Sequence, residues 1–373
     1  MKNLIVFCLI FLMISGAFGA GPSEKCVPPL PGDINSDCQV NFKDLAILAA
    51  NWMKKSSVSR PLVIRTDSST PVSDILIPGQ EKALAVFRLE AGNIEDLDLD
   101  SITVNVENGE KLQVIYLYWG ETLLGSRPGS KLASFFFEDG EVVIPAGGNV
   151  KITVKAIPLP VDNYVVKNGT LIRAYLFGSD AARTTGRDSA LTVNSGEQIA
   201  IGAEMKIYEA WPHFSLNPYF PRELILIPRL NHLLAMLDVS AQGEKDITFG
   251  ESGQIAINIA SVRYHKDGED NLWWLTDENG TVLCSVFADD NAFRVVFAFK
   301  DKKMFVVPSG TTKTLYVWGD TREYNVCGDA IQVWLDDSSN YNCVFGIDGV
   351  GVYPEGEIIF RPDIWGCVFY RLL

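Results

Sequence analysis

The chain has 373 residues, 47% of them hydrophobic, and this is enough to bury a sizeable core in about two domains. Its 46 Asp and Glu residues outnumber its 32 Lys and Arg residues, which gives a formal net charge of −14. This charge excludes nucleic acid as a partner, because binding to phosphates depends on basic side chains.

The first twenty residues have the pattern of a secretory signal peptide. Lys2 precedes the apolar run 4–14, and small residues follow, among which Ala17 and Gly19 suit a cleavage site. The apolar run is too short to cross a membrane comfortably, so we expect no membrane span in the mature chain. We therefore predict a secreted protein located outside the cell or at the cell surface, with a linker at 21–31.

Residues 33–44, which read DINSDCQVNFKD, carry oxygen-bearing side chains at the spacing of a twelve-residue calcium loop. Ca²⁺ binds six to eight oxygens, and alternate residues of a tightly turning loop converge on one point. A plain polar turn before a short helix is the alternative interpretation. The predicted Ca²⁺ ligands are Asp33, Asn35, Asp37, Gln39 (through its backbone carbonyl), Asn41 and Asp44.

An amphipathic helix is predicted directly after this loop, with Leu45, Leu48 and Trp52 on one face. The run GDINSDCQVNFKDLAILAANW resembles one repeat of a type I dockerin module, in its Gly-Asp-x-Asn-x-Asp start, its Asp at the last loop position and its Leu-rich helix. We assign 32–54 to this EF-hand-like repeat and 55–61 to a linker.

The resemblance to dockerins implies a docking role. Dockerins bind cohesin domains, so a cohesin-like or other surface protein is the implied partner, and Phe42 and Lys43 are the implied partner-binding residues. The chain departs from the family in two respects: we find one repeat where dockerins carry two, and Cys38 stands where the loop normally has Gly.

Six cysteines remain after removal of the leader, and an even number outside the cytosol predicts disulfides. Cys26 and Cys38 are the predicted pair near the calcium loop. The pairing of the late cysteines does not follow from the sequence; these are Cys284, Cys327, Cys343 and Cys367.

Strand patterns dominate beyond residue 60, with alternating segments such as 150–154 and turns such as Asn108-Gly109. We therefore predict a mainly β fold with two tandem antiparallel β-sandwich domains, at 62–202 and 203–373. Their strand and turn pattern resembles β-sandwich modules of bacterial surface and filament proteins.

Three collinear internal matches support a duplication. Residues 75–99 align without gaps on 225–249, with eight identities in 25 positions. Two shorter matches follow in the same order and include Gly147 with Gly310 and Gly169 with Gly328. The Val-Ile/Val-Pro-Ala/Ser-Gly match marks a strand that leads into a turn, and the three matches together predict duplicated domains.

No catalytic motif stands out, and we predict that the chain is not an enzyme. The acidic run 95–100 alternates with Leu, as in a half-solvated strand. A glycoside hydrolase would need two carboxylates across a cleft, and such a pair leaves no local motif. Five tryptophans lie in strand patterns, where we favour a core role over a sugar-binding face; these are Trp119, Trp273, Trp274, Trp318 and Trp334.

Three functions remain open at this point. The favoured one is a calcium-binding cell-surface or extracellular structural protein that acts in adhesion or assembly, with a homo-oligomer or filament as one form. The second is a dockerin-bearing accessory component of polysaccharide degradation that binds carbohydrate. The third is a glycoside hydrolase of unrecognised type.

Overall fold

The structure is a computed structural model, and its strands lie in the part of the chain from Pro61 to Leu373. The described residues form one α-helix, α2 (Phe42–Lys55), one 3₁₀ turn, η1 (Gly109–Lys111), and 28 strands, so the predicted mainly β class is confirmed. The structure describes residues 32, 34, 39–55, 62–162, 164–220, 223–250, 253–261, 272–287, 294–299, 305–335, 343–352 and 364–371.

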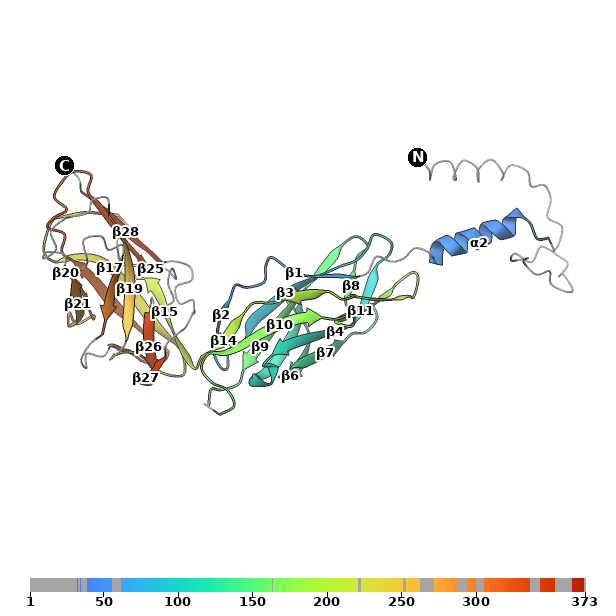
Figure 1. The fold of residues 1–373 in the computed structure, drawn as a ribbon, viewed down its shortest axis with the longest axis horizontal. Coiled ribbons are helices and arrows are strands. Elements are labelled where there is room, and N and C mark those ends of the chain that lie inside the picture. The colour runs from blue at the N-terminus through green and yellow to red at the C-terminus, as the bar shows by residue number, and fades with distance from the viewer. Residues whose placement is uncertain are drawn as a thin grey trace. The chain divides into compact units, whose positions relative to one another are not determined.

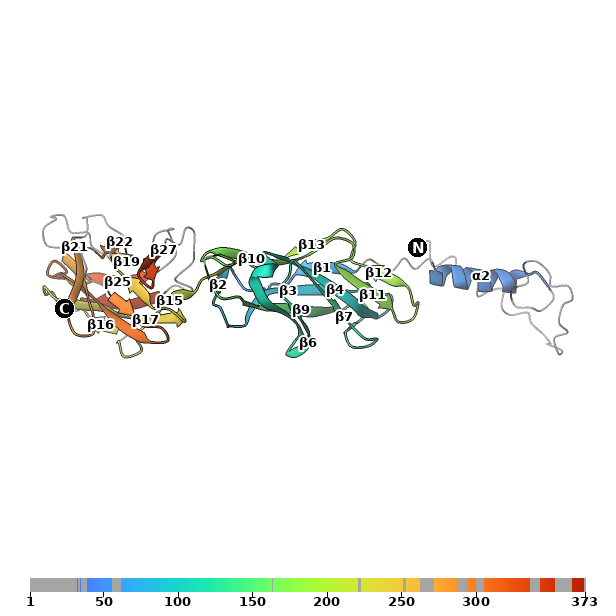
Figure 2. The same cartoon turned by 90° about the horizontal axis from the view of Figure 1, so that it is seen from below.

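The first body is a sandwich of two sheets (Figure 1). Its five-stranded sheet has the order β1 (Val63–Thr66), β3 (Lys82–Glu90), β9 (Asn149–Pro158), β5 (Leu112–Trp119) and β6 (Thr122–Pro128). Its nine-stranded sheet follows the path β12 (Thr192–Asn194), β11 (Ala182–Gly186), β4 (Leu97–Glu107), β10 (Thr170–Phe177), β14 (Met205–Ile207) and β2 (Asp74–Leu76). Three short strands complete this sheet: β7 (Leu132–Phe136) and β8 (Val143–Ile144) beside β4, and β13 (Ile199–Ile201) beside β10 (Figure 2).

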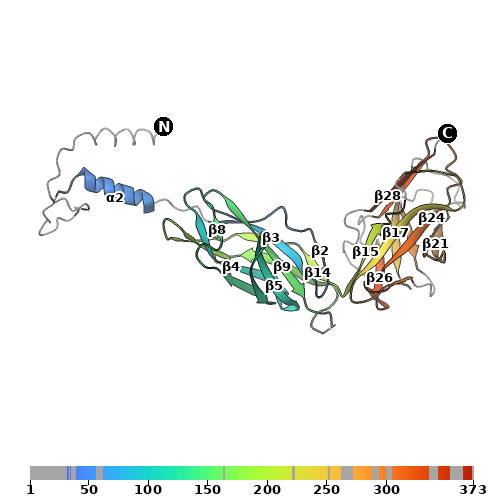
Figure 3. The ribbon, with the colours of Figure 1, turned by 180° about the vertical axis from the view of Figure 1, so that it is seen from behind.

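The second body is also a sandwich of two sheets, and β17 and β24 of its smaller sheet are labelled in Figure 3. The five-stranded sheet has the order β15 (Ala210–Leu216), β17 (His232–Gly243), β24 (Thr312–Gly319), β20 (Leu272–Thr276) and β21 (Val282–Phe287). The larger sheet follows β16 (Glu223–Ile225), β28 (Ile364–Tyr370), β25 (Ala330–Leu335), β19 (Gln254–Ser261), β26 (Cys343–Ile347), β18 (Ile247–Phe249) and β23 (Phe305–Val307). Two more strands join it: β22 (Arg294–Ala298) beside β19 and β27 (Val350–Val352) beside β26.

The two bodies share one topology. In the small sheets, β15, β17, β24, β20 and β21 take the places of β1, β3, β9, β5 and β6. In the large sheets, the second strand of each body pairs in parallel with its last strand, β2 with β14 and β16 with β28. The other pairs of named strands are antiparallel, so the predicted antiparallel β-sandwiches are confirmed. The second and last strands of each body run in the same direction and meet at one edge of the large sheet.

The repeat extends to the register of single residues. Both long central strands carry a β-bulge at the same aligned position, between Ala83 and Ala85 in β3 and between Leu233 and Ala235 in β17. The extra residue of each bulge, Leu84 or Leu234, is fully buried. Because a bulge is inserted at one defined position, its recurrence supports the ungapped alignment of the two segments.

The first body extends beyond residue 202, the end predicted from the sequence. β14 (Met205–Ile207) pairs with β10 and with β2, both of which belong to the first body. The next strand, β15, starts at Ala210 and pairs with β17 of the second body. The chain therefore passes from one body to the other between Ile207 and Ala210.

Alternating burial confirms the prediction for residues 97–100 of the acidic run, whereas Glu95 at its start is buried. In β4, Leu97 and Leu99 are buried, while Asp98 and Asp100 stay partly exposed. In β19, by contrast, Ile255, Ala256 and Ile257 are all buried, so burial does not alternate along this strand. β19 is paired on both sides, with β25, β22 and β26, which places it inside its sheet.

Candidate functional site

The helix α2 begins with a capping arrangement at the end of the predicted calcium loop. The side-chain Oδ1 of Asn41 accepts a hydrogen bond from the backbone N–H of Lys43 at 2.8 Å. The Oδ2 of Asp44 accepts one from the backbone N–H of Asn41 at 2.9 Å. These reciprocal bonds are the capping-box pattern, which satisfies N–H groups that a helix leaves without partners at its start.

Asp44 also closes the loop. Its Oδ1 accepts a hydrogen bond from the backbone N–H of Ile34 at 2.7 Å, so loop positions 2 and 12 lie together. The Asp44 side chain is buried, with 3% of its surface exposed. A twelve-residue calcium loop requires this closure, because its first and last ligands bind the same ion.

Three of the six predicted ligands belong to the described residues, namely Gln39, Asn41 and Asp44. Carboxylate, amide and carbonyl oxygens are the ligands that Ca²⁺ prefers, so this donor set fits the ion. The other three, Asp33, Asn35 and Asp37, lie outside the described residues, as do both members of the predicted Cys26–Cys38 disulfide. Within the described ranges, no group of three or more His, Cys, Asp and Glu side chains is placed to hold a metal ion.

The surface beside the loop is apolar. Phe42, one of the two predicted partner-binding residues, is 74% exposed, and the other, Lys43, is exposed as well. Leu45 and Leu48, which the sequence places on the buried face of an amphipathic helix, are 55% and 47% exposed. The first turns of α2 therefore present an apolar surface to solvent.

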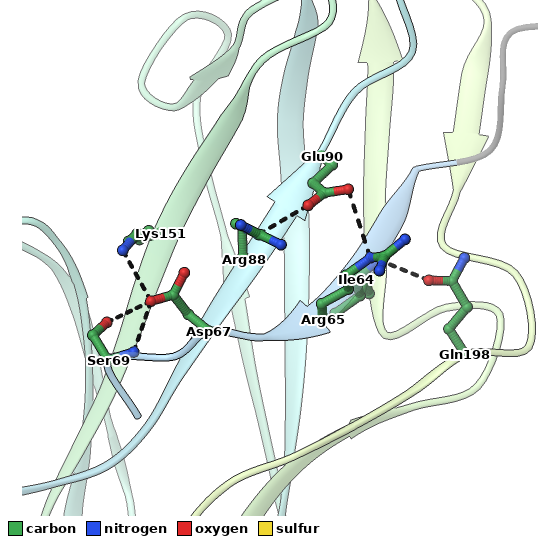
Figure 4. Close-up of polar contacts among 8 residues, drawn as sticks. All are labelled: Ile64, Arg65, Asp67, Ser69, Arg88, Glu90, Lys151 and Gln198. Carbon is green, nitrogen blue, oxygen red and sulfur yellow. Dashed lines mark hydrogen bonds and ion pairs between the residues drawn. The ribbon is translucent and has the colours of Figure 1, made fainter. Parts of the chain in front are cut away.

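Figure 4 shows a polar cluster on the small sheet of the first body, where β1 ends. The Asp67 carboxylate accepts hydrogen bonds from Ser69 Oγ at 2.6 Å, from Ser69 N at 2.9 Å and from Lys151 Nζ at 2.9 Å. These bonds hold the pKa of Asp67 far below its usual range, the bond from the Ser69 hydroxyl contributing most. Asp67 is thus a charged structural anchor.

The rest of this cluster fastens β1 to its neighbours. Glu90 on β3 forms ion pairs with Arg88 Nε at 2.9 Å and with Arg65 Nε at 3.7 Å (Figure 4). The Gln198 Oε1 accepts a hydrogen bond from the backbone N–H of Ile64 at 2.8 Å. These contacts stabilise an edge strand and do not converge on an empty space.

Hydrogen bonds also keep the buried carboxylate of Glu95 charged. Burial alone would raise the pKa of Glu95, but bonds from the Ser189 hydroxyl and from the backbone N–H groups of Ser189 and Asp188 outweigh it and lower the pKa. Among the described carboxyl groups, each shifted pKa is shifted downward, as for Asp162 and Asp277. A general acid of a glycoside hydrolase needs the opposite shift.

The described tryptophans correct the prediction that these rings fill the cores. Trp273 is buried in the second body, with 3% of its surface exposed, but Trp119 is 39% exposed and Trp274, Trp318 and Trp334 are half-buried. On the small sheet, Trp274 and Trp318 lie parallel within 5°, with ring centroids 6.5 Å apart. On the large sheet, Trp334 is stacked on Trp365, a residue that the sequence pattern did not single out.

The strand register also relates the residues of β5 to those of β20. In the first body, Leu117 pairs with Val154, and Val154 pairs with Ala85 on β3. In the second body, Leu275 pairs with Val317, and Val317 pairs with Ala235 on β17, the position aligned with Ala85. Tyr116 is therefore the counterpart of Trp274.

No disulfide joins the four late cysteines in the part of the chain that the structure describes. Cys343 lies on β26 and Cys367 on β28, and β19 and β25 separate these strands. Three strand spacings amount to about 14 Å, whereas a disulfide needs Cα atoms within about 7 Å. The predicted disulfides of the final third are therefore not found.

A surface depression of about 560 Å³ lies on the first body, between the segment 70–73 and β13. An ion pair between Arg173 and Glu204 is part of its lining. Because these charges neutralise each other, the depression has no excess charge to attract an ion.

None of the described helices is long and apolar enough to cross a membrane.

Comparison with known proteins assigns no family. No family model and no curated protein matches the chain. The fold is similar to the C-terminal domain of the Streptococcus pyogenes antigen I/II-family protein AspA, with 7% identity, 83% of this chain and 100% of that chain covered, and a TM-score of 0.22. It is also similar to the BSP domain of a biofilm-associated protein (7% identity, 90% and 70% covered, TM-score 0.26).

A third similar structure is the type II cohesin dyad from the adaptor ScaA scaffoldin of Acetivibrio cellulolyticus. The identity is 9%, 81% of this chain and 98% of that chain are covered, and the TM-score is 0.22. At these identities and TM-scores the three similarities transfer neither a family nor a function to this chain.

Proposed function

We propose that this chain is a secreted, non-catalytic protein of the cell surface or extracellular space, which acts in adhesion or assembly. Its two β-sandwiches are the structural bodies, and the segment 32–54 is a calcium-stabilised docking element. The hydrogen bond between Ile34 N and Asp44 Oδ1 carries the proposal, because it closes the loop beside an exposed apolar surface.

In this proposal, a bound Ca²⁺ ion stabilises the loop. Asp33, Asn35 and Asp37 would join the side chains of Asn41 and Asp44 and the backbone carbonyl of Gln39. The ion would offset the repulsion between three carboxylates in a short segment. A rigid loop would then hold the first turn of α2, with Phe42 and Lys43, in one orientation toward a partner.

Exposed apolar side chains beside the loop indicate the partner surface. Exposed apolar side chains that gather at one place mark interaction sites. Phe42, Val40 and Leu45 are each more than half exposed, at 74%, 58% and 55%, and lie beside the loop closed by Asp44. A cohesin-like or other surface protein with an apolar docking face suits this surface.

Calorimetric titration with Ca²⁺ tests the loop. We expect heat of binding from the parent and none from Asp33→Ala/Asp37→Ala, while circular dichroism shows unchanged strand content in both. Asp139→Ala, which removes an exposed acid in a turn of the first body, is the matched control and should bind as the parent does. Equal binding heats in the double variant and the parent would refute the calcium proposal.

Pulldown against the cell-surface extract of the source tests docking. We expect one captured species that disappears when a chelator is added and when Phe42→Ala/Lys43→Ala replaces the parent. Capture that is indifferent to both changes would contradict a docking role for this surface, even if the calorimetry showed Ca²⁺ uptake.

Carbohydrate binding is the second candidate function, and the half-buried indoles of Trp274 and Trp318 are the observation that favours it. These indoles lie on the small sheet of the second body.

A further inference from the structure

We propose that the outer face of the small sheet in the second body binds a neutral pyranose polysaccharide, with Trp274 and Trp318 as its stacking platform. This site is independent of the calcium loop and of the apolar surface on α2. It lies on the strands β17, β24, β20 and β21.

The cross-strand register brings the platform together. Trp274 on β20 pairs directly with Trp318 on β24, which in turn pairs with Leu233 on β17. In the next row, Tyr316 pairs with Met236. Alternate residues of a strand share a face, so Tyr316 and Trp318 point to the same side, opposite the buried Leu315 and Val317.

The platform is held in place before any ligand arrives. The Trp318 Nε1–H donates a hydrogen bond to Thr276 Oγ1 at 3.0 Å, which fixes the orientation of this indole. The rings of Trp274 and Trp318 are parallel within 5°. Because both side chains are half-buried, each keeps part of its surface in solvent.

The repeat provides an internal control for whether these rings are needed by the fold. The first body has Tyr116 in place of Trp274 and Lys155 in place of Trp318. There, Lys155 Nζ lies 4.3 Å from the centroid of the Tyr118 ring and 3.0 Å from Glu81 Oε1. The same sheet thus forms with a charged group over its aromatic residue, so the paired indoles are not required by the topology.

Polar groups on the same face complete the chemistry of a sugar site. The Oδ1 of Asp238 accepts hydrogen bonds from Asn217 Nδ2 at 2.8 Å and from Thr314 Oγ1 at 2.7 Å, which orients its carboxylate. Thr314 and Trp318 are four residues apart on one strand, about 14 Å at about 3.4 Å per residue. This length suits an oligosaccharide, whose C–H faces pack on indoles while its hydroxyls bond to the carboxylate.

Charge selects a neutral glycan over an acidic one. The chain has a net charge of −14, and the polar group placed on the platform is itself an acid, Asp238. An acidic polysaccharide would be repelled by both.

Affinity gel electrophoresis of the full chain tests the proposal, with cellulose, xylan, mannan and mixed-linkage glucan derivatives that are uncharged. We expect at least one of them to retard the parent. Trp274→Ala/Trp318→Ala should bind at least about tenfold more weakly, and Asp238→Asn about threefold to tenfold more weakly. Trp274→Phe/Trp318→Phe, which keeps flat rings and packing, should retain most of the binding and separates loss of binding from loss of folding.

Two matched controls locate the site. Tyr116→Ala/Tyr118→Ala alters the equivalent face of the first body, and Trp365→Ala removes an exposed indole from the other sheet. Both should bind as the parent does. The proposal is overturned if no neutral glycan retards the parent, if the double Trp variant binds unchanged, or if that variant instead abolishes self-association of the protein.

Discussion

Buried acidic side chains accept hydrogen bonds from donors that lie close to them in the structure. Asp67 and Glu95 each receive hydrogen bonds at both ends of the carboxylate or from a charged group, and the buried Asp320 forms a bidentate ion pair with Arg322. A buried charge without such partners would cost several kcal/mol. These acids therefore maintain the turns between strands, and the same bonds depress the pKa values of Asp67 and Glu95.

Asp67→Asn is expected to destabilise the first body by about 1–3 kcal/mol at pH 7, because it removes the charge that faces Lys151 and weakens the bonds from Ser69. The folded-state pKa of Asp67 is lowered, so its contribution is present above the unfolded pKa of about 3.9 and is lost as pH falls below it. Urea unfolding at pH 7 and pH 3 should show the variant and the parent converging at low pH. A constant difference at both pH values would contradict this assignment.

His232 gives the second body a pH dependence in a higher range. Burial lowers the pKa of His232, the Arg229 charge lowers it further, and the hydrogen bond from Nδ1–H to the Ile227 carbonyl, 3.0 Å long, acts against both. The unfolded chain therefore takes up the proton first. Stability should fall as pH drops below about 6.5, by at most about 1.4 kcal/mol per pH unit.

Thermal unfolding between pH 7.5 and 5.5 measures this effect. His232→Gln should flatten the pH dependence, although it also lowers stability at pH 7.5 by disturbing the contact with Phe369. His213 is exposed, and His213→Gln should leave the slope as it is in the parent. An unchanged slope in His232→Gln would show that another group is responsible.

At the scale of elements, the repeated turns show how backbone geometry dictates sequence. Gly147 and Gly310 end aligned strand-to-turn segments, and both have a φ of 67°. This left-handed conformation is costly for a residue with a Cβ atom. The motif Val-Ile/Val-Pro-Ala/Ser-Gly therefore recurs because the strand must stop at Pro and the chain must then turn.

Replacement of these two glycines by Ala should have unequal effects. Gly310→Ala has open space around the new Cβ and should cost only the backbone strain, about 1 kcal/mol. Gly147→Ala would place its Cβ 2.7 Å from Asn93 Oδ1, so it should cost more than Gly310→Ala. Denaturant unfolding of each body measures both costs, and equal values would mean that Asn93 moves aside without penalty.

At the scale of the whole molecule, the strand-bearing part has two cores. The buried residues of the first body fall mainly in one cluster, which includes Phe87 and Phe135, and those of the second body make up most of another, which includes Phe249 and Phe297. We expect two unfolding transitions in calorimetry, one for each core.

Core truncations assign these transitions. Phe87→Ala should lower the transition of the first body by about 3–5 kcal/mol, and Phe297→Ala should lower that of the second body by a similar amount, since each side chain is fully buried. Each variant is the control for the other. A single transition that shifts equally in both variants would contradict separate cores.

The candidate sites differ in how far the sequence predicted them. The calcium loop at 33–44 was predicted from its local spacing and stays a prediction, and the structure adds the hydrogen bond from Ile34 N to Asp44. The sequence predicted the proposed carbohydrate platform only in part. Trp274 and Trp318 were noted, but a core role was favoured for them over a sugar-binding face. The sequence analysis did not identify Asp238 and Thr314. Both alternate with buried residues in β17 and β24, and this pattern places them on the outer face of the sheet.

The sequence by itself determined the strands, their turns and the duplication, because alternation, Pro and positive-φ Gly act between residues that are near neighbours along the chain. Only the tertiary structure decided the parallel pairing of the second strand of each body with its last strand, the separation of Cys343 from Cys367 and the outward direction of Trp274 and Trp318. These features depend on which distant strands become neighbours and in what register. A shift of one residue would reverse the face that each side chain occupies.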